Sequence, residues 1–185
     1  MSRQDWLDAI KGIRNLRVLV IAALMTALVI VLGYFYIPVT ENLRIMLTFI
    51  PMAFGGMLCG PVMGVLIGLA GDLIGFFIHP SGPFFFGYTI SAMLSGFVYG
   101  LFLYHKEIAF WRITLTKAII NLFINVGLGC LWSMLLYGKA YWVAFSASIV
   151  KNLLLLPAES WVLFLIARAL KPLLHKFDIG FKSMQ

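Results

Sequence analysis

Long apolar segments alternate with short polar or turn-forming segments along most of this chain. A helix needs about 20 apolar residues to cross the roughly 30 Å hydrocarbon layer of a membrane. The run over 45–58 is shorter than that, and the corner Cys59-Gly60-Pro61 separates it from the next run. The pattern predicts six transmembrane helices, the second of them tilted or extended into the loop before it. They are expected at 16–36, 45–58, 62–78, 87–104, 113–137 and 142–170.

The composition supports this interpretation. Of the 185 residues, 62% are hydrophobic and only 11% are charged, whereas a soluble domain has about 25% charged residues. The predicted fold is therefore an all-α integral membrane protein, a compact bundle of six transmembrane helices. The whole chain, 1–185, forms one transmembrane domain. Its bundle occupies 16–170, between a short N-terminal segment at 1–15 and a tail at 171–185.

The positions of the basic residues predict the orientation of the bundle. Cytoplasmic segments of membrane proteins carry an excess of Lys and Arg. Most of the 14 Lys and Arg residues lie in segments that six spans would place on one side, so both termini are expected in the cytoplasm. The net charge of +7 then reflects orientation and does not indicate nucleic-acid binding. These basic residues are Arg3, Lys11, Arg14 and Arg17 in the N-terminal segment, Lys106, Arg112 and Lys117 in the loop between the fourth and fifth helices, and Arg168, Lys171, Lys176 and Lys182 in the tail after the sixth.

Small residues recur at four-residue intervals in two neighbouring helices. This spacing places them on one stripe and allows another helix to approach closely. They are Gly56, Gly60, Gly64 and Gly68 before and after the corner, and Ala92, Gly96 and Gly100 in the helix over 87–104. We expect most of them to pack inside the bundle. In the first helix, Ala23 and Ala27 have the same spacing, which suits either internal packing or docking of another membrane protein.

The segment HPSGPFFFGYTISA, residues 79–92, interrupts two apolar runs with turn residues, aromatic rings and hydroxyl groups. The residues Pro80 to Pro83 cannot continue a helix. Six spans would place this segment on the outer side of the membrane. We expect a stiff loop that presents Phe84 to Phe86 as a stacking surface, with Tyr88, Thr89 and Ser91 just below it.

A few polar residues are expected inside the membrane, among them Asp72, Asn121, Asn125, Lys151, Asn152 and Glu159. Charge in a bilayer is expensive and is normally paired or faces a cavity. One interpretation is that Asp72 pairs with Lys151. The other is a binding site at the outer side, where Arg44, Lys139 and Lys151 could attract an anion beside the aromatic rings. No catalytic motif, metal-ligand spacing or phosphate loop is present, so no enzyme activity, cofactor or metal is expected.

Several segments resemble a known family, the S components of energy-coupling factor (ECF) vitamin transporters, and within it the folate-specific branch. The resemblance covers roughly 16–170 and is carried by LRIMLTFIP (43–51), GPVMG (60–64), DLIGFF (72–77) and FFFGYTISA (84–92). The family often has Pro before the Gly of the last segment, where this chain has Phe86.

The resemblance implies a function and partners. S components have six helices with both termini inside, and they bind a vitamin in a cavity that opens to the outside of the bacterial cell membrane. They associate with a membrane coupling subunit (EcfT) and two cytoplasmic ATPases (EcfA and EcfA′), and they are thought to topple in the bilayer. In the family, small residues of an Ala-x-x-x-Ala pattern on the first helix contact the coupling subunit. Ala23 and Ala27 match that pattern.

For folate, the pterin ring would stack on Phe or Tyr and hydrogen-bond with the polar residues, while Arg44, Lys139 or Lys151 would attract the glutamate carboxylates. An S component for pyridoxine, hydroxymethylpyrimidine, pantothenate or riboflavin is the alternative. A membrane scaffold subunit without a ligand is a third possibility from a different class. The predicted substrate-binding residues are Tyr36, Arg44, Asp72, Phe84, Phe85, Phe86, Tyr88, Thr89, Ser91, Trp132, Lys151 and Asn152.

Overall fold

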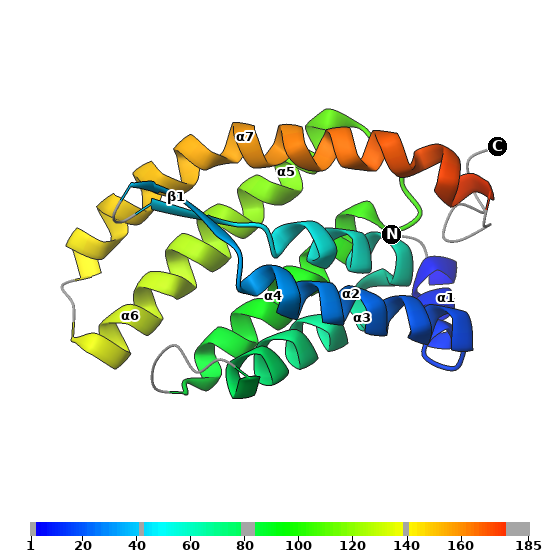
Figure 1. The fold of residues 1–185 in the computed structure, drawn as a ribbon, viewed down its shortest axis with the longest axis horizontal. Coiled ribbons are helices and arrows are strands. Elements are labelled where there is room, and N and C mark those ends of the chain that lie inside the picture. Colours follow the sequence, from blue (N-terminus) through cyan, green and yellow to red (C-terminus); the bar gives the residue numbers. More distant parts are fainter. Residues whose placement is uncertain (1–2, 41–42, 79–83, 139–140, 177–185) are drawn as a thin grey trace.

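Helices make up nearly all of the described chain and lie along one another as a bundle (Figure 1). The structure is a computed structural model, and it describes residues 3–40, 43–78, 84–138 and 141–176. Its elements are α1 (Arg3–Gly12), α2 (Leu16–Gly33), β1 (Tyr36–Thr40), β2 (Leu43–Met46), α3 (Phe49–Ile78), α4 (Phe86–Leu103), α5 (Phe110–Ile119), the π-helix η1 (Ile120–Leu128), α6 (Gly129–Tyr137) and α7 (Tyr141–Lys176).

Within the described residues, 5 helical stretches are long and apolar enough to cross a membrane. This agrees with the prediction of a helical membrane bundle. The expected fifth helix corresponds to the consecutive elements α5, η1 and α6. The stretches are Leu16–Gly33, Phe49–Ile78, Phe86–Leu103, Phe110–Leu136 and Ser148–Lys171.

The helix expected over 62–78 and most of the one expected over 45–58 lie in α3, which contains a sharp corner. The expected start at 45 is wrong, since Ile45 and Met46 belong to β2 and α3 begins at Phe49. Gly60 has φ 85° and ψ 175°, dihedral angles outside the helical range. A positive φ of this size suits glycine because it has no Cβ. The chain therefore turns at Gly60, before Pro61, as the sequence predicts.

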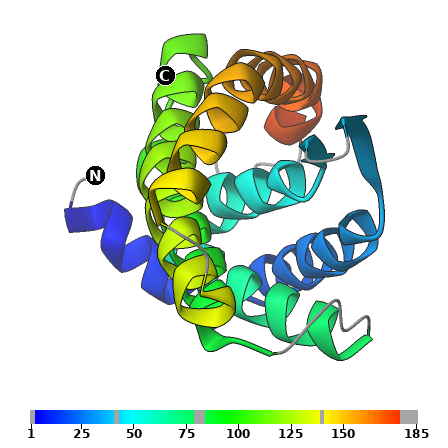
Figure 2. The same cartoon turned by 90° about the vertical axis from the view of Figure 1, so that its left-hand side faces the viewer.

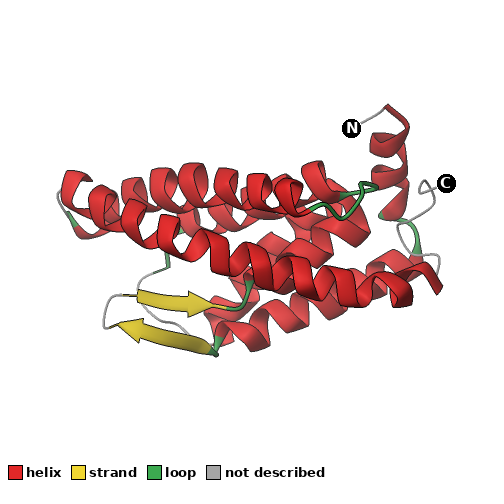
Figure 3. Ribbon diagram, turned by 90° about the horizontal axis from the view of Figure 1, so that it is seen from above, coloured by secondary structure: helices red, strands yellow, loops and turns green. Residues whose placement is uncertain are grey.

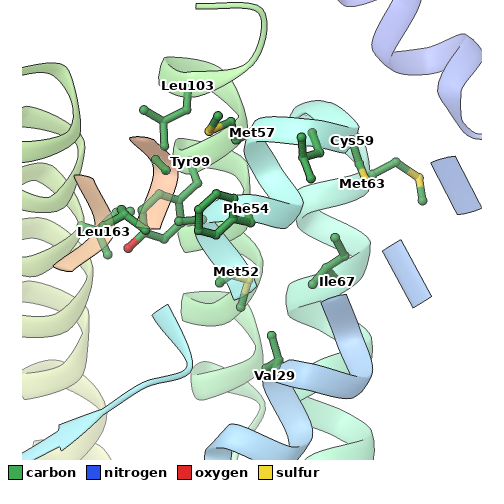
Figure 4. Packing of buried hydrophobic residues seen from close by; sticks show 14 of the residues in the cluster. Val29, Met52, Phe54, Met57, Cys59, Met63, Ile67, Tyr99, Leu103 and Leu163 are labelled. Carbon is green, nitrogen blue, oxygen red and sulfur yellow. The ribbon is translucent and has the colours of Figure 1, made fainter. Parts of the chain in front are cut away.

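The first half of α3 is covered on all sides by the rest of the bundle. Every residue from Pro51 to Pro61 is buried, and Figure 2 shows this cyan segment enclosed by the other helices. A helix that is hydrophobic all round is expected in such a place. Its side chains, among them Phe54 and Met57, join Tyr99 and Leu103 of α4 and Leu163 of α7 in the buried cluster of Figure 4.

The small residues of α3 and α4 form the close contact that their spacing predicts. A Cβ atom on Gly56 would lie 2.7 Å from the backbone nitrogen of Gly100, and one on Gly96 would collide with the carbonyl group of Gly64. The backbone of Ala92 likewise leaves no room for a Cβ on Gly68. The two helices therefore pack backbone against backbone, which small residues allow between membrane helices.

Three short elements were not anticipated, the strands β1 and β2 and the helix α1. The strands β1 and β2 pair antiparallel, with Tyr36 opposite Met46 and Pro38 opposite Arg44, and they contain the β-branched and aromatic residues typical of strands. This hairpin lies at one end of the bundle, hereafter the hairpin end (Figure 3). The helix α1 lies at the opposite end, where Ala9 is fully buried and the Trp6 ring lies 6.1 Å from that of Phe97.

The first long helix, α2, presents one of its small residues inward and two outward. Ala22 is buried, whereas Ala23 and Ala27 are exposed on the outside of the bundle. Large apolar side chains surround them on the same helix, since Val20 and Leu24 are also exposed. Ala23 and Ala27 are therefore not part of the packing within the chain.

Candidate functional site

A cavity of about 570 Å³ lies inside the bundle, between the hairpin and helices α3, α4, α5, η1 and α7. Cavities that bind small molecules usually measure about 300–1,000 Å³. Five of the predicted substrate-binding residues line this cavity. They are Asp72, Tyr88, Ser91, Lys151 and Asn152.

The cavity is elongated along the bundle. Its lining residues on α4 run from Tyr88 to Tyr99, and those on α7 run from Ser148 to Glu159. At 1.5 Å per residue, each of these stretches spans roughly 16 Å. Tyr88 and Ser148 lie toward the hairpin end, whereas Tyr99 and Glu159 lie deeper in the bundle and define what we call the inner end of the cavity. The shape suits a long, narrow ligand.

Near the hairpin end, a carboxylate and a hydroxyl group from two helices are joined. Thr89 Oγ1 donates a hydrogen bond of 2.6 Å to Asp72 Oδ2, and Thr89 is fully buried behind the cavity wall. The alternative pairing of Asp72 with Lys151 is not present among the described residues. Lys151 lines the same cavity and has no acidic partner in the described part of the chain. Asp72 and Lys151 thus present opposite charges to the cavity from different helices.

An aromatic wall supports the neighbouring part of α4. Trp132 Nε1 donates a hydrogen bond of 2.9 Å to Ser91 Oγ. The Phe85 ring lies 5.4 Å from that of Trp132 and 6.0 Å from that of Tyr88, in edge-on arrangements. A Cβ atom on Gly87 would lie 2.7 Å from the Trp132 ring, so this glycine lets the indole approach α4. Trp132 and Phe85 therefore hold Ser91 and Tyr88 in place from behind.

The other two residues of the aromatic triplet lie on the outside of the bundle. Phe84 and Phe86 are 47% and 55% exposed, and the ring of Phe84 packs at 5.1 Å from that of Phe76. Among the described residues, the triplet does not contribute to the lining of the cavity. Its role as a stacking surface therefore stays a prediction.

Some of the predicted site lies outside the description. The loop from Pro80 to Pro83 and Lys139 are outside the described residues. For Tyr36 and Arg44, the structure gives the strand pairing but does not describe the side chains. Their predicted roles in binding remain predictions.

The inner end of the cavity contains an ion pair that the sequence analysis did not identify. Lys117 Nζ lies 2.7 Å from Glu159 Oε2, and the two side chains are 3% and 12% exposed. Lys117 Nζ also lies 4.1 Å from the centre of the Phe49 ring. The placement of Lys117 in a cytoplasmic loop is therefore wrong. Since α5 begins at Phe110, Lys117 is about two turns inside the helix and faces the interior.

Two asparagines extend this ion pair along the π-helix η1. Asn121 Nδ2 donates to Glu159 Oε2 at 3.3 Å, and Asn125 Nδ2 donates to Asn121 Oδ1 at 3.1 Å. Asn121 is buried, whereas Asn125 lines the cavity. The sequence placed both amides on one helix face. The sequence does not indicate that Glu159 is their acidic partner. The only signal is that Glu159 is a charged residue within an apolar run.

The cavity combines apolar and aromatic surface with a few polar groups that converge from different helices, which is typical of small-molecule sites. Within the described residues, no group of three or more His, Cys, Asp or Glu residues could hold a metal ion. The arrangement suits the binding of a flat, partly polar molecule.

Comparisons with known proteins agree with this description. A sequence model described as "ECF transporter, substrate-specific component" matches residues 17–167. The chain is 33% identical over 151 residues to a protein named Folate transporter FolT from Clostridium novyi (strain NT), across 82% of this chain and 88% of that protein. It is 32% identical over 149 residues to a FolT from Leuconostoc mesenteroides, across 77% and 80% of the two chains.

The fold is also similar to a solved structure. A crystal structure of FolT bound with folic acid superposes with a TM-score of 0.76 at 26% identity, and the match covers 84% of this chain and 95% of that one. These proteins are transport subunits of bacterial cell membranes and not enzymes, in keeping with the apolar, span-length helices described above. The resemblance seen in the sequence segments is confirmed. The chain belongs to the family of substrate-specific components, or S components, of ECF transporters.

Proposed function

We propose that this protein binds folate at the outer face of a bacterial membrane and delivers it across the membrane together with a coupling subunit and two ATPases. The observation that carries the proposal is the elongated cavity, in which Asp72, Ser91, Lys151 and Asn152 converge from three helices. It occurs in a chain whose relatives are named folate transporters. The similar solved structure contains folic acid.

The chemistry of the cavity suits the two ends of folate. A pterin ring is flat and has hydrogen-bond donors and acceptors along its edge. Asp72, Ser91 and Asn152 line the cavity and could match part of that edge, while Thr89 holds the Asp72 carboxylate from behind. The glutamate end carries carboxylates, and Lys151 has no acidic partner in the described part of the chain. Arg44 and Lys139 are the other cations assigned to this end of the ligand. Charge-assisted hydrogen bonds of this kind are about twice as strong as neutral ones.

The proposal includes six spans with both termini in the cytoplasm. Support comes from the corner at Gly60, which divides α3 into two helical parts, and from the basic residues near α1 and the end of α7. The hairpin end would then face outward, and the inner end of the cavity would lie near the middle of the membrane.

The coupling subunit would dock on α2. Ala23 and Ala27 are exposed there, while Ala22 packs inward. Two small residues four positions apart leave a shallow strip on which another helix can lie closely. The proposal therefore separates the surface that binds the partner from the cavity that binds the vitamin.

Titration of the purified protein with a panel of vitamins tests the proposed ligand. The panel contains folic acid, pyridoxine, hydroxymethylpyrimidine, pantothenate and riboflavin, and the readout is quenching of the 5 tryptophans. We expect submicromolar binding of folic acid alone. Tight binding of a different vitamin would assign the protein to that vitamin, and no binding across the panel would favour a scaffold subunit.

A further inference from the structure

The buried ion pair fixes the direction of hydrogen bonds around it. Glu159 Oε2 lies 2.7 Å from Lys117 Nζ, which can only donate hydrogen bonds, so this oxygen is an acceptor. The group of Asn121 that faces Glu159 Oε2 must therefore be its NH₂ group, in agreement with the 3.3 Å contact from Nδ2.

This constraint passes to the next amide. Because the Asn121 NH₂ group faces Glu159, its oxygen faces Asn125, and Asn125 must present its own NH₂ group there. The 3.1 Å contact from Asn125 Nδ2 to Asn121 Oδ1 has this sense. A rotation of the Asn125 amide by 180° would place two oxygens together, which an amide avoids. The Asn125 carboxamide is thus held in one of its two orientations.

The free side of that carboxamide belongs to the cavity. Asn125 is one of the residues that line it, and no described residue donates a hydrogen bond to Asn125 Oδ1. With one N–H used by Asn121, Asn125 has an acceptor and a second N–H donor left, side by side. Asn121 and Asn125 both lie in a π-helix, a rare element often found at functional sites.

A second polar group at the inner end is also without a partner. The Tyr99 side chain lines the cavity, is 1% exposed, and its hydroxyl group has no hydrogen-bond partner among the described residues. Buried polar groups are normally satisfied by a protein group, water or a ligand. Two independent groups at the inner end, Tyr99 and Asn125, therefore have hydrogen-bonding capacity available for a ligand.

We propose that Asn125 is a specificity-determining residue that pairs with the ring of the ligand, and that Lys117, Glu159 and Asn121 are positioning residues that fix its orientation. The inference rests on the proposed folate ligand. The 2-amino-4-oxo ring of folic acid presents the N3–H donor next to the O4 acceptor, which matches the acceptor and donor of Asn125. The 4-amino analogue of folic acid has these roles reversed, and the fixed amide cannot turn to match it.

The experiment compares the Kd of folic acid with that of its 4-amino analogue by tryptophan quenching. Wild type should prefer folic acid by about tenfold or more, because the mismatch leaves buried polar groups unpaired. Asn125→Leu should lose most of that preference, chiefly through weaker binding of folic acid. Asn125→Ala serves the same purpose if the leucine variant does not fold.

The positioning role has its own readout. Asn121→Leu removes the oxygen that holds the Asn125 amide, so the amide can turn and the preference should shrink through tighter binding of the 4-amino analogue. A merely structural role for Asn121 would weaken both ligands equally. Phe123→Leu is the matched control, since Phe123 lies on the same π-helix, is 71% exposed, and should leave the ratio unchanged.

The outcomes separate this inference from the proposed function. If wild type does not bind folic acid, the proposed function fails and the inference fails with it. If wild type binds folic acid but the Asn125 variants keep the wild-type ratio, or lose affinity for both ligands equally, the inference is overturned while the proposed function stands.

Discussion

Lys117 and Glu159 place a positive and a negative charge inside the bundle, where each depends on the other. Taking a charge out of water is costly, and the attraction between partners at 2.7 Å offsets that cost. Phe49 provides a ring face at 4.1 Å as a further favourable contact for the ammonium group. Removal of one partner leaves the other charge buried and uncompensated.

Lys117→Met should therefore destabilise the protein strongly, by about 3–5 kcal/mol, the usual cost of breaking a buried ion pair from one side. Thermal unfolding in detergent measures the change. The double variant Lys117→Met/Glu159→Leu should regain much of the loss, because no isolated charge remains. Lys106→Met, in the connection before α5, should unfold near the wild-type temperature. A double variant no more stable than the single one would contradict this account.

At the level of residues, the sequence predicted one half of the site better than the other. Asp72, Lys151 and Asn152 were among the predicted substrate-binding residues, and they line one cavity. The sequence analysis assigned Lys117 to the loop before the fifth helix because it follows Arg112 closely. The rule that cytoplasmic segments are rich in Lys and Arg considers only the position of a residue along the chain. The pairing of Lys117 with Glu159 joins two distant helices, and no spacing within either helix encodes it.

At the level of elements, the contact between α3 and α4 depends on the absence of side chains. Gly64 and Gly96 place their backbones against each other, and Gly56 does the same with Gly100. This close approach also brings Asp72 of α3 within hydrogen-bonding distance of Thr89 of α4. The glycine contact therefore helps to set the shape of the cavity.

Gly96→Ala should lower the thermal stability, at a cost of about 1–3 kcal/mol or more, because its methyl group would collide with the Gly64 carbonyl and push the helices apart. Gly75→Ala is the matched control, since a Cβ at Gly75 has no neighbour within 4 Å. The control should keep or slightly raise the unfolding temperature, as alanine favours helix. Equal unfolding temperatures for the two variants would show that the contact is not tight.

The long helices and the glycine contact could be predicted because each has a pattern of its own, either a continuous apolar run or a four-residue repeat. The hairpin could not. Its strands of 5 and 4 residues are too short to show a distinct alternation of apolar and polar residues. Their ends were therefore assigned to the apolar runs on either side. The π-helix was also missed, since its sequence reads as ordinary helix and only the hydrogen-bond geometry distinguishes it.

For the whole molecule, the proposed division is between a cavity inside the bundle and a docking surface outside it. The exposed pair Ala23 and Ala27 lies on α2, and no residue of α2 is among those that line the cavity. Within this arrangement, a bulky side chain on α2 would block a partner helix without reaching the ligand.

Ala23→Trp should accordingly abolish assembly with the coupling subunit and vitamin uptake, while the Kd of folic acid stays near the wild-type value. Co-purification with the coupling subunit and uptake by cells measure the first effect, and tryptophan quenching measures the second. Leu165→Trp places the same ring at a 54% exposed position on α7 and should assemble normally. Undiminished assembly and uptake by the Ala23 variant would remove α2 as the docking surface.

The enclosed first half of α3 has a consequence for how the protein is made. The segment from Phe49 to Cys59 has only about half of the roughly 20 residues that a membrane span requires. It is therefore too short to enter the lipid as a separate span during synthesis. It also has no face suited to lipid, since every residue from Pro51 to Cys59 is buried, in part against α4 and α7, which are synthesised later. Its final position can form only after α4 and α7 have entered the bilayer, which makes completion of the chain the step that closes the core.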